Sequence, residues 1–205
     1  IHERLVGSEM CIRDSPSLGQ CCGGALVLRF ERVDQNHAPR LIGILQKQAA
    51  DTFQPLALFG GGHVGKALVK VLAPLPFDVR WIDSRDEIFP PDIESHVVCE
   101  HSNPVHAAVP ELAPFSRVLI MSFSHAEDLD IVAACLLRQR QQQDLPFVGL
   151  IGSATKWATF KKRLAERGFS EAECAHITCP IGIPGIAGKE PEVIAVAVAA
   201  QLLQV

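Results

Sequence analysis

A glycine cluster at residues 60–65 constrains the fold of this chain more than any other feature of its sequence. The cluster reads Gly-Gly-Gly-His-Val-Gly; it follows the apolar, strand-like run 55–59 and opens the helix-like stretch 66–72. In a G-x-G-x-x-G loop between a strand and a helix, the first glycine makes the tight turn, the second lets the backbone approach a diphosphate, and the third lets helix and strand pack closely. The candidate ligand contacts in this loop are Gly60, Gly61, Gly62, His63 and Gly65.

A carboxylate stands where a dinucleotide site would need one. The strand-like run 77–82 leads into Asp83, about twenty residues after the glycines, where a carboxylate would meet a ribose 2′-hydroxyl. Arg85 follows closely and leaves room for a 2′-phosphate instead. The pattern predicts a nucleotide-binding type of fold and leaves open whether the glycines serve a bound ligand or packing alone.

Strands and helices alternate from residue 55 onward. Strands are expected at 55–59, 77–82, 96–99, 117–121 and 147–151, and helices at 66–72, 126–141, 155–167 and 191–203. This order predicts an α/β fold, a Rossmann-like parallel sheet with helices on both faces. Such a sheet binds its ligands beyond the carboxyl ends of its strands.

The first 54 residues differ in character from the rest. Two strands are expected at 25–33 and 41–45, and the polar stretch 46–54 is interpreted as a linker. The opening residues resemble translated sequencing-adapter text, so we give them no functional weight. The expected divisions are a non-native segment at 1–15, a small, apparently truncated β-containing module at 16–54, and the Rossmann-like domain at 55–205.

Composition argues against two classes of partner. The 205 residues carry a net charge of −4, and the one dense basic run, 161–163, lies on a predicted helix, so nucleic acid is not expected as a partner. No apolar stretch reaches the roughly 18 to 20 residues of a membrane span, and no membrane role is expected. Seven cysteines, an odd number without a C-x-x-C pair, favour the cytoplasm.

Small and polar residues follow the later strands and should converge on the glycine loop. Ser124 or His125, and then Ser153, are expected to cap helices, which leaves backbone N–H groups that suit phosphate oxygens; capping alone is the alternative. Asp128 could approach His125 or simply complement the helix dipole. The candidate contacts after these strands are Ser122, His125, Gly152 and Ser153.

The adjacent thiols Cys21 and Cys22 precede two glycines just before a strand. Glycines leave a neighbouring sulfur accessible, and an accessible thiolate binds soft metals or carries sulfur, although cysteine also serves as a small buried hydrophobe. Cys99 and Cys135 lie in apolar patterns and are expected in the core. The pattern around Cys179, beside a proline, leaves its role open.

Five segments together resemble the xanthine dehydrogenase accessory factor (XdhC/CoxI) family. The most specific are Gly-Leu-Ile-Gly-Ser-Ala-Thr-Lys within 147–156 and Cys-Pro-Ile-Gly within 177–182; the others are 17–24, 58–65 and 188–196. The N-terminal module is shortened against that family.

The resemblance implies a chaperone rather than a catalyst. Such proteins bind the finished molybdenum cofactor (molybdopterin) as cargo, protect it from oxidation, work with a cysteine desulfurase that replaces an oxo by a sulfido ligand, and deliver it to apo-xanthine dehydrogenase, an enzyme of purine catabolism. On this reading Gly60, Gly62 and Gly65, with Ser153, hold the phosphate end. Cys21 or Cys22 faces the dithiolene, with Cys22 the candidate molybdenum contact.

Two other functions fit the same residues. An NAD(P)-dependent oxidoreductase would use the same loop with Asp83 on the ribose, but only His125 is available as an acid or base, and the N-terminal module is too small for a substrate region. A scaffold that only docks partner enzymes would not need the backbone-exposing glycines. The sequence leaves a homodimer open.

Overall fold

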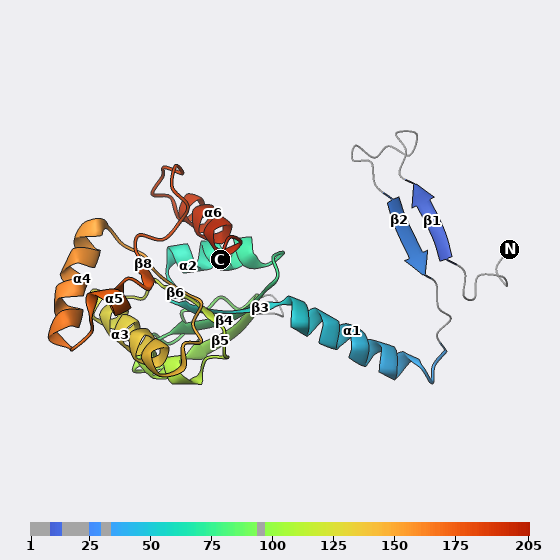
Figure 1. Cartoon of the computed structure of the whole chain (residues 1–205), viewed down its shortest axis with the longest axis horizontal. Helices are drawn as coiled ribbons and strands as arrows, with labels where there is room; N and C mark the ends of the chain where they lie inside the picture. Colours follow the sequence, from blue (N-terminus) through green and yellow to red (C-terminus); the bar gives the residue numbers. More distant parts are fainter. Residues whose placement is uncertain (1–8, 14–24, 30–33, 94–96) are drawn as a thin grey trace. The chain divides into compact units, whose positions relative to one another are not determined.

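The computed structural model describes residues 9–13, 25–29, 34–93 and 97–205 (Figure 1). The chain divides into two compact units, Ile1–Asp51 and Thr52–Val205. Among the helices within the described ranges, none combines the length and the apolar character needed to cross a membrane.

The first unit contains a strand pair and most of a helix. Strands β1 (Glu9–Arg13) and β2 (Ala25–Arg29) pair antiparallel, with Glu9 opposite Arg29. Helix α1 (Ala38–Thr52) follows after a turn at Asp34, whose carboxylate accepts the N–H groups of two of the next three residues.

Helix α1 shows that the predicted strand at 41–45 was wrong, while the boundary between the two units falls within the stretch 46–54 that was interpreted as a linker. The run Leu-Ile-Gly-Ile-Leu is short and wholly apolar, and periodicity cannot distinguish a strand from a helix in such a run. The neighbouring residues decide the outcome. Pro39 lies in the first turn, where its fixed φ suits a helix, and the residues after Leu45 include the good helix formers Gln, Lys and Ala.

The second unit is built on a six-stranded parallel sheet with the order β5-β4-β3-β6-β7-β8 (Figure 1). This confirms the predicted Rossmann-like fold, and β8 is too short for its pattern to have been seen in the sequence. The strands are β3 (Gln54–Phe59), β4 (Phe77–Asp83), β5 (Val97–His101), β6 (Arg117–Ile120), β7 (Phe147–Leu150) and β8 (Ile177–Thr178).

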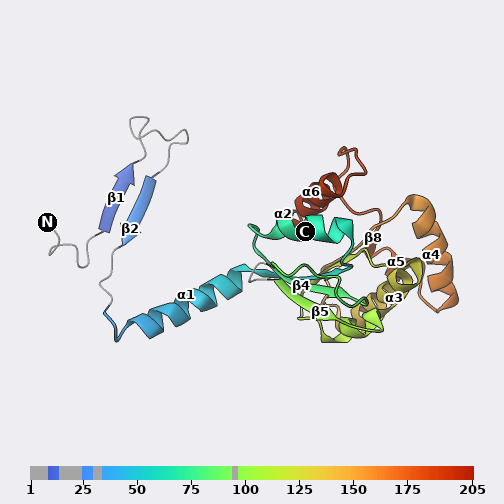
Figure 2. The same cartoon turned by 180° about the vertical axis from the view of Figure 1, so that it is seen from behind.

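Helices cover both faces of this sheet (Figure 2). One face is covered by α2 (His63–Leu72) and α6 (Pro191–Leu202), and the other by the 3-10 helix η2 (Val105–Glu111), α3 (His125–Gln142), α4 (Ala154–Glu166) and α5 (Glu171–Cys174). Side chains of β3 alternate between the two layers: Leu56 and Leu58 pack on the α2 side, Ala57 and Phe59 on the α3 side. All four are at most 1% exposed, so β3 is the centre of the core.

The order of the strands places a topological switch point between β3 and β6. From β3 the chain moves outward to β4 and β5, then returns to place β6 on the other side of β3. The connections after β3 and β6 therefore leave in opposite directions. A parallel sheet binds its ligands at such a point, beyond the carboxyl ends of the strands.

A buried ion pair ties the end of α3 to the loop before β7, and we expect it to make stability depend on pH. One edge of the Arg138 guanidinium donates two bonds to Asp144, Nε to Oδ1 at 3.0 Å and Nη2 to Oδ2 at 2.6 Å. The hydrogen bonds from Arg138 hold the pKa of the Asp144 carboxyl below its ordinary value. A lowered pKa in the folded state contributes stability above the unfolded value of about 3.9, and this contribution is lost as pH falls through the folded value.

Thermal unfolding of the wild type and Asp144→Asn between pH 7 and pH 2.5 tests this expectation. The variant should melt lower at neutral pH, and the gap should close as the solution becomes acidic. A gap that stays constant down to the lowest pH would contradict the assignment.

Candidate functional site at the carboxyl edge of the sheet

Two glycines of the loop after β3 are required by packing alone. Gly60 has φ +122°, and a Cβ added there would lie 2.0 Å from the carbonyl oxygen of Met121, at the end of β6. A Cβ on Gly65 would lie 2.1 Å from the carbonyl oxygen of Gly60, which also accepts a hydrogen bond from the Trp81 indole at 3.0 Å. These contacts close the turn and hold α2 against β3.

Gly62 is different, because within the described residues no close contact requires a glycine there. A Cβ built there meets no atom within 4 Å, and the φ of −70° is open to any residue. Gly62 is the N-cap of α2, and no side chain caps this helix end. The N–H groups of the first turn of α2, beside the exposed His63, therefore face an open space in which an anion could bind.

Asp83 supports the loop from the end of β4. Its Oδ2 accepts the Gly61 N–H at 2.6 Å, and Arg85 donates from Nε to Oδ1 and from Nη2 to Oδ2, both at 2.9 Å. Burial alone would raise the pKa of this carboxyl, but the bonds from Arg85 and Gly61 outweigh it and lower the pKa. Both oxygens thus have partners inside the protein, while the predicted contact with a ribose stays a prediction.

A second polar cluster lies after β6 and β7. Asp128 accepts the Ser122 N–H at 2.9 Å and the Ser122 hydroxyl at 2.7 Å through Oδ1, and the Lys156 ammonium at 2.6 Å through Oδ2. Lys156 also donates to the carbonyl oxygen of Ile151 at 2.8 Å. Asp128 therefore joins the loop after β6 to α4, and it does not pair with His125 as the sequence allowed.

The helix caps predicted at this edge are confirmed. The Ser124 hydroxyl accepts the N–H of Glu127, and the Ser153 hydroxyl accepts the N–H of Lys156, each at 3.2 Å. His125 is exposed and packs edge to face on Phe160, with 6.3 Å between ring centroids.

Gly152 lies between the lysine and a thiol. A Cβ there would be 2.7 Å from the Lys156 Cδ and 3.5 Å from the Cys179 sulfur. Burial raises the pKa of the half-buried Cys179 thiol, an effect that Lys156 opposes and Asp128 reinforces. Burial also raises the pKa of the core thiol Cys135, to about 12. Neither thiol is activated as a thiolate.

The predicted site residues of the Rossmann-like unit all lie at or after the carboxyl ends of β3, β4, β6 and β7. Cys21 and Cys22 lie outside the described residues, and their predicted roles stay predictions. Within the described ranges no group of three or more His, Cys, Asp or Glu side chains could hold a metal ion. Sequence reasoning missed the role of Lys156, although it is the lysine of the most specific motif.

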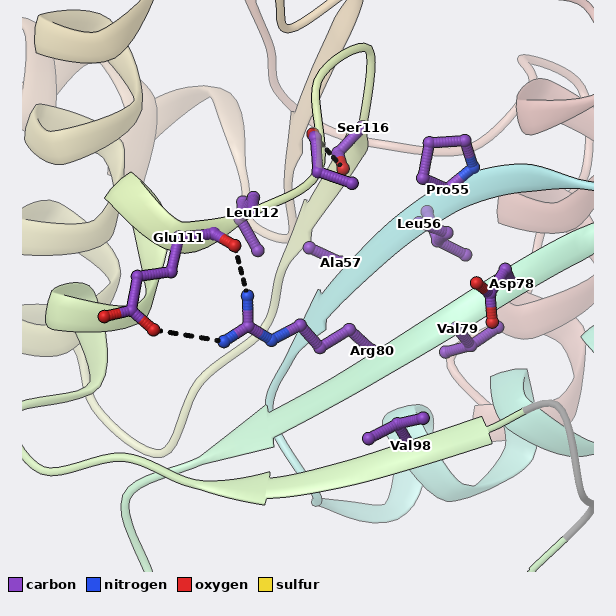
Figure 3. Close-up of a pocket in the computed structure, with 11 residues that line it drawn as sticks. Pro55, Leu56, Ala57, Asp78, Val79, Arg80, Val98, Glu111, Leu112 and Ser116 are labelled. Atoms are coloured by element: carbon purple, nitrogen blue, oxygen red, sulfur yellow. Dashed lines mark hydrogen bonds and ion pairs between the residues drawn. The ribbon is translucent and has the colours of Figure 1, made fainter.

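A pocket of about 320 Å³ lies at the opposite edge of the sheet (Figure 3). Pro55, at the start of β3, and Ser116, just before β6, lie on its wall. Arg80 donates to the Glu111 carbonyl oxygen at 2.8 Å and also pairs with the Glu100 carboxylate, so its charge is already balanced. Because ligands of parallel sheets bind beyond the carboxyl ends, this pocket is not the candidate site.

A comparison with known families decides the classification. The model of the XdhC Rossmann domain matches residues 56–202, which is most of the chain and all of the sheet except the start of β3. The chain belongs to the XdhC Rossmann-domain family. This membership confirms the family resemblance that the sequence motifs indicated.

Two similar proteins show the extent of the likeness. The protein YqeB of Escherichia coli (strain K12) is 28% identical over 209 residues, which cover 98% of this chain and 33% of YqeB. A xanthine dehydrogenase from Bacillus halodurans with a known crystal structure superimposes with a TM-score of 0.60 at 23% identity, over 74% of this chain and 42% of that one. The XdhC-family chain thus spans well under half the length of either protein, and the structural likeness shows the fold.

Proposed function

We propose that this XdhC-family protein serves xanthine dehydrogenase maturation in the cytoplasm. It binds the molybdenum cofactor as cargo, supports its sulfuration together with a cysteine desulfurase, and delivers it to apo-xanthine dehydrogenase. Family membership supports the role in maturation. The carboxyl edge of the sheet supports the binding of a cargo that has an anionic end.

The observation that carries the proposal is the open space at Gly62. In a turn kept for packing alone, close contacts would explain each glycine. They explain Gly60 and Gly65, but Gly62 has no such contact. The N-terminus of α2 has no side-chain cap, and its N-cap residue is a glycine. The phosphate of molybdopterin would therefore reach the N–H groups of α2. Ser153 at the start of α4 supplies a further polar group at the same edge.

Asp83 and His125 favour a cargo chaperone over an NAD(P)-dependent oxidoreductase. A ribose would have to compete with Arg85 and the Gly61 N–H for the oxygens of Asp83. His125 makes an aromatic contact but, within the described part of the chain, no hydrogen bond that would orient it as an acid or base. We therefore keep NAD(P) as a competing ligand in the test and not as the proposed one.

The direct test is a binding assay with the purified full chain. The protein is incubated anaerobically with molybdenum cofactor, with NADH or with NADPH, and molybdenum, pterin and nucleotide are measured after gel filtration. We expect retained molybdenum and pterin in equal amounts and no nicotinamide. Retention of nicotinamide without pterin would overturn the proposal. In the same assay, unchanged cofactor retention by a Cys21→Ser, Cys22→Ser double variant would show that these thiols do not hold the cofactor.

Gly62→Val should abolish cofactor retention while the protein stays folded. The valine side chain would project into the space where the phosphate is proposed to bind, and its Cβ meets no protein atom within 4 Å. We expect at least about a hundredfold weaker binding, since a phosphate held by several N–H groups would be displaced. The measurement is cofactor retained after gel filtration, with the thermal midpoint as the check on folding.

Gly43→Val is the matched control for this variant. Gly43, in α1, is also a glycine with an ordinary φ and no atom within 4 Å of an added Cβ. It should retain the cofactor as the wild type does. Equal retention by both variants would show that Gly62 does not border the ligand.

A further inference from the structure

Two loops meet across the end of β3, above the glycine loop. One follows β4 and the other links β6 to α3. The Ser84 hydroxyl of the first loop donates to Oε1 of Glu127, in the first turn of α3, at 2.5 Å. The Arg85 guanidinium carbon lies 4.8 Å from the ring centroid of Phe123. Residues from β4, β6 and α3 are thereby gathered next to the proposed phosphate site.

Phe123 is an aromatic ring presented to solvent at this position. It is 67% exposed, directly after the strand β6 that borders β3, and the guanidinium contact leaves most of its surface free. Because the Phe123 ring is mostly exposed, it contributes little hydrophobic stabilisation to the free protein. At the edge of a ligand site it offers a surface for stacking.

Arg85, which contacts the Phe123 ring, is linked to the glycine loop through Asp83. Both oxygens of Asp83 accept from Arg85, and one of them also accepts the Gly61 N–H. The contacts from Gly61 to Asp83, Arg85 and Phe123 connect the aromatic ring to the loop. A ligand with its phosphate at α2 would therefore have the ring close by.

Glu127 adds a hydrogen-bond acceptor that has no partner. Its Oε1 accepts from Ser84, but Oε2 is buried and, among the side-chain atoms in the described ranges, is the one buried oxygen or nitrogen without a hydrogen bond. Glu127 is also close enough to contribute to the raised pKa of Arg85, after the larger effect of Asp83. A buried acceptor without a donor is unfavourable, and an N–H group of a ligand would satisfy it.

We propose that Phe123 and Arg85 form a stacking platform for the planar ring of the cargo, and that Glu127 accepts N–H hydrogen bonds from the edge of that ring. The inference rests on the proposed function and names the part of the cofactor that this end of the site takes. Its ligand class is the 2-amino-4-oxopyrimidine ring of pterins. The edge of that ring presents two neighbouring N–H donors: Oε2 of Glu127 would accept one, and Oε1, which already accepts from Ser84 through one lone pair, would accept the other. Nicotinamide and adenine present no such pair of donors.

Anaerobic fluorescence titration of the full chain with molybdenum cofactor tests the platform. Phe123→Leu should weaken binding about tenfold, the loss typical of one stacked ring. Phe115→Leu is the matched control, because Phe115 is equally exposed at 67% but lies before β6, at the opposite edge of the sheet. It should bind as the wild type does. Both residues are exposed, so neither substitution should lower the thermal midpoint.

Competition by two ring probes tests Glu127. Neopterin carries the 2-amino group, and the lumazine probe, which bears the same trihydroxypropyl side chain, has the same bicyclic ring with an oxygen in place of that group. Neopterin should displace the cofactor from the wild type at least about tenfold more effectively than lumazine, as expected where a site is built to pair with N–H donors. Glu127→Gln, which keeps an acceptor for Ser84, should abolish this preference.

The outcomes separate the inference from the function on which it rests. If the wild type binds no cofactor, the proposed function fails and the platform fails with it. If the wild type binds and Phe123→Leu binds equally well, the platform is overturned while the proposed function stands. A neopterin preference that persists in Glu127→Gln would overturn the role of Glu127.

Discussion

Gly60→Ala should destabilise the Rossmann-like unit by roughly 4 kcal/mol. At φ +122° an alanine is strained, which costs about 1–3 kcal/mol, and forcing an extra carbon into a filled space costs about 1–3 kcal/mol more. The added Cβ would lie 2.0 Å from the Met121 carbonyl oxygen, which is backbone and cannot move aside like a side chain. The loss would be a large part of a typical total stability of about 5–15 kcal/mol.

Urea unfolding of the full chain measures this loss, with Gly62→Ala as the matched control. Gly62 lies two residues away in the same loop but has an ordinary φ and open space around an added Cβ. The free energy of unfolding of the Gly62→Ala variant should stay within about 0.5 kcal/mol of that of the wild type. Equal midpoints for the two variants would show that the contact with Met121 does not determine the glycine at position 60.

Lys156→Met should cost about 3–5 kcal/mol, because it would leave a buried charge without its partner. The side chains of Lys156 and Asp128 are 10% and 3% exposed, and their charged atoms are 2.6 Å apart. Methionine fills a similar volume, so the loss would come from the carboxylate and not from a cavity. The same carboxylate positions the Ser122 N–H and hydroxyl, so the edge of the candidate site should loosen as well.

Adding Asp128→Asn to Lys156→Met distinguishes charge from packing. Removing both charges of a buried pair is often close to neutral, so the double variant should recover most of the lost stability. Lys162→Met, at an exposed position of the same helix, should change the free energy of unfolding by less than about 0.5 kcal/mol. If the double variant is as unstable as Lys156→Met alone, packing and not the ion pair explains the loss.

Local signals in the sequence predicted the fold of the second unit well. The strand ends at Phe59 and Asp83 and the caps at Ser124 and Ser153 are each marked by a few neighbouring residues, and all of them are confirmed. The prediction failed at 41–45, where five apolar residues fit either a strand or a helix.

Contacts between residues far apart in the chain could not be predicted. The ion pair of Lys156 with Asp128 spans 28 positions, and the bond from Ser84 to Glu127 spans 43. Neither residue of such a pair carries a mark of its partner in the sequence. The exposure of Phe123 could not be predicted either, because a phenylalanine after a strand is usually part of the core.

The sequence by itself determined that this chain folds into a Rossmann-like sheet, because glycine geometry, strand patterns and caps act over a few residues, and its motifs indicated the XdhC family. Only the tertiary structure decided what the individual glycines do. Gly60 and Gly65 are required by backbone that approaches from other elements, whereas Gly62 borders open space. The tertiary structure also decided that Asp83 accepts hydrogen bonds from Arg85 and from the glycine loop, because the order of the strands brings the ends of β4, β3 and β6 together.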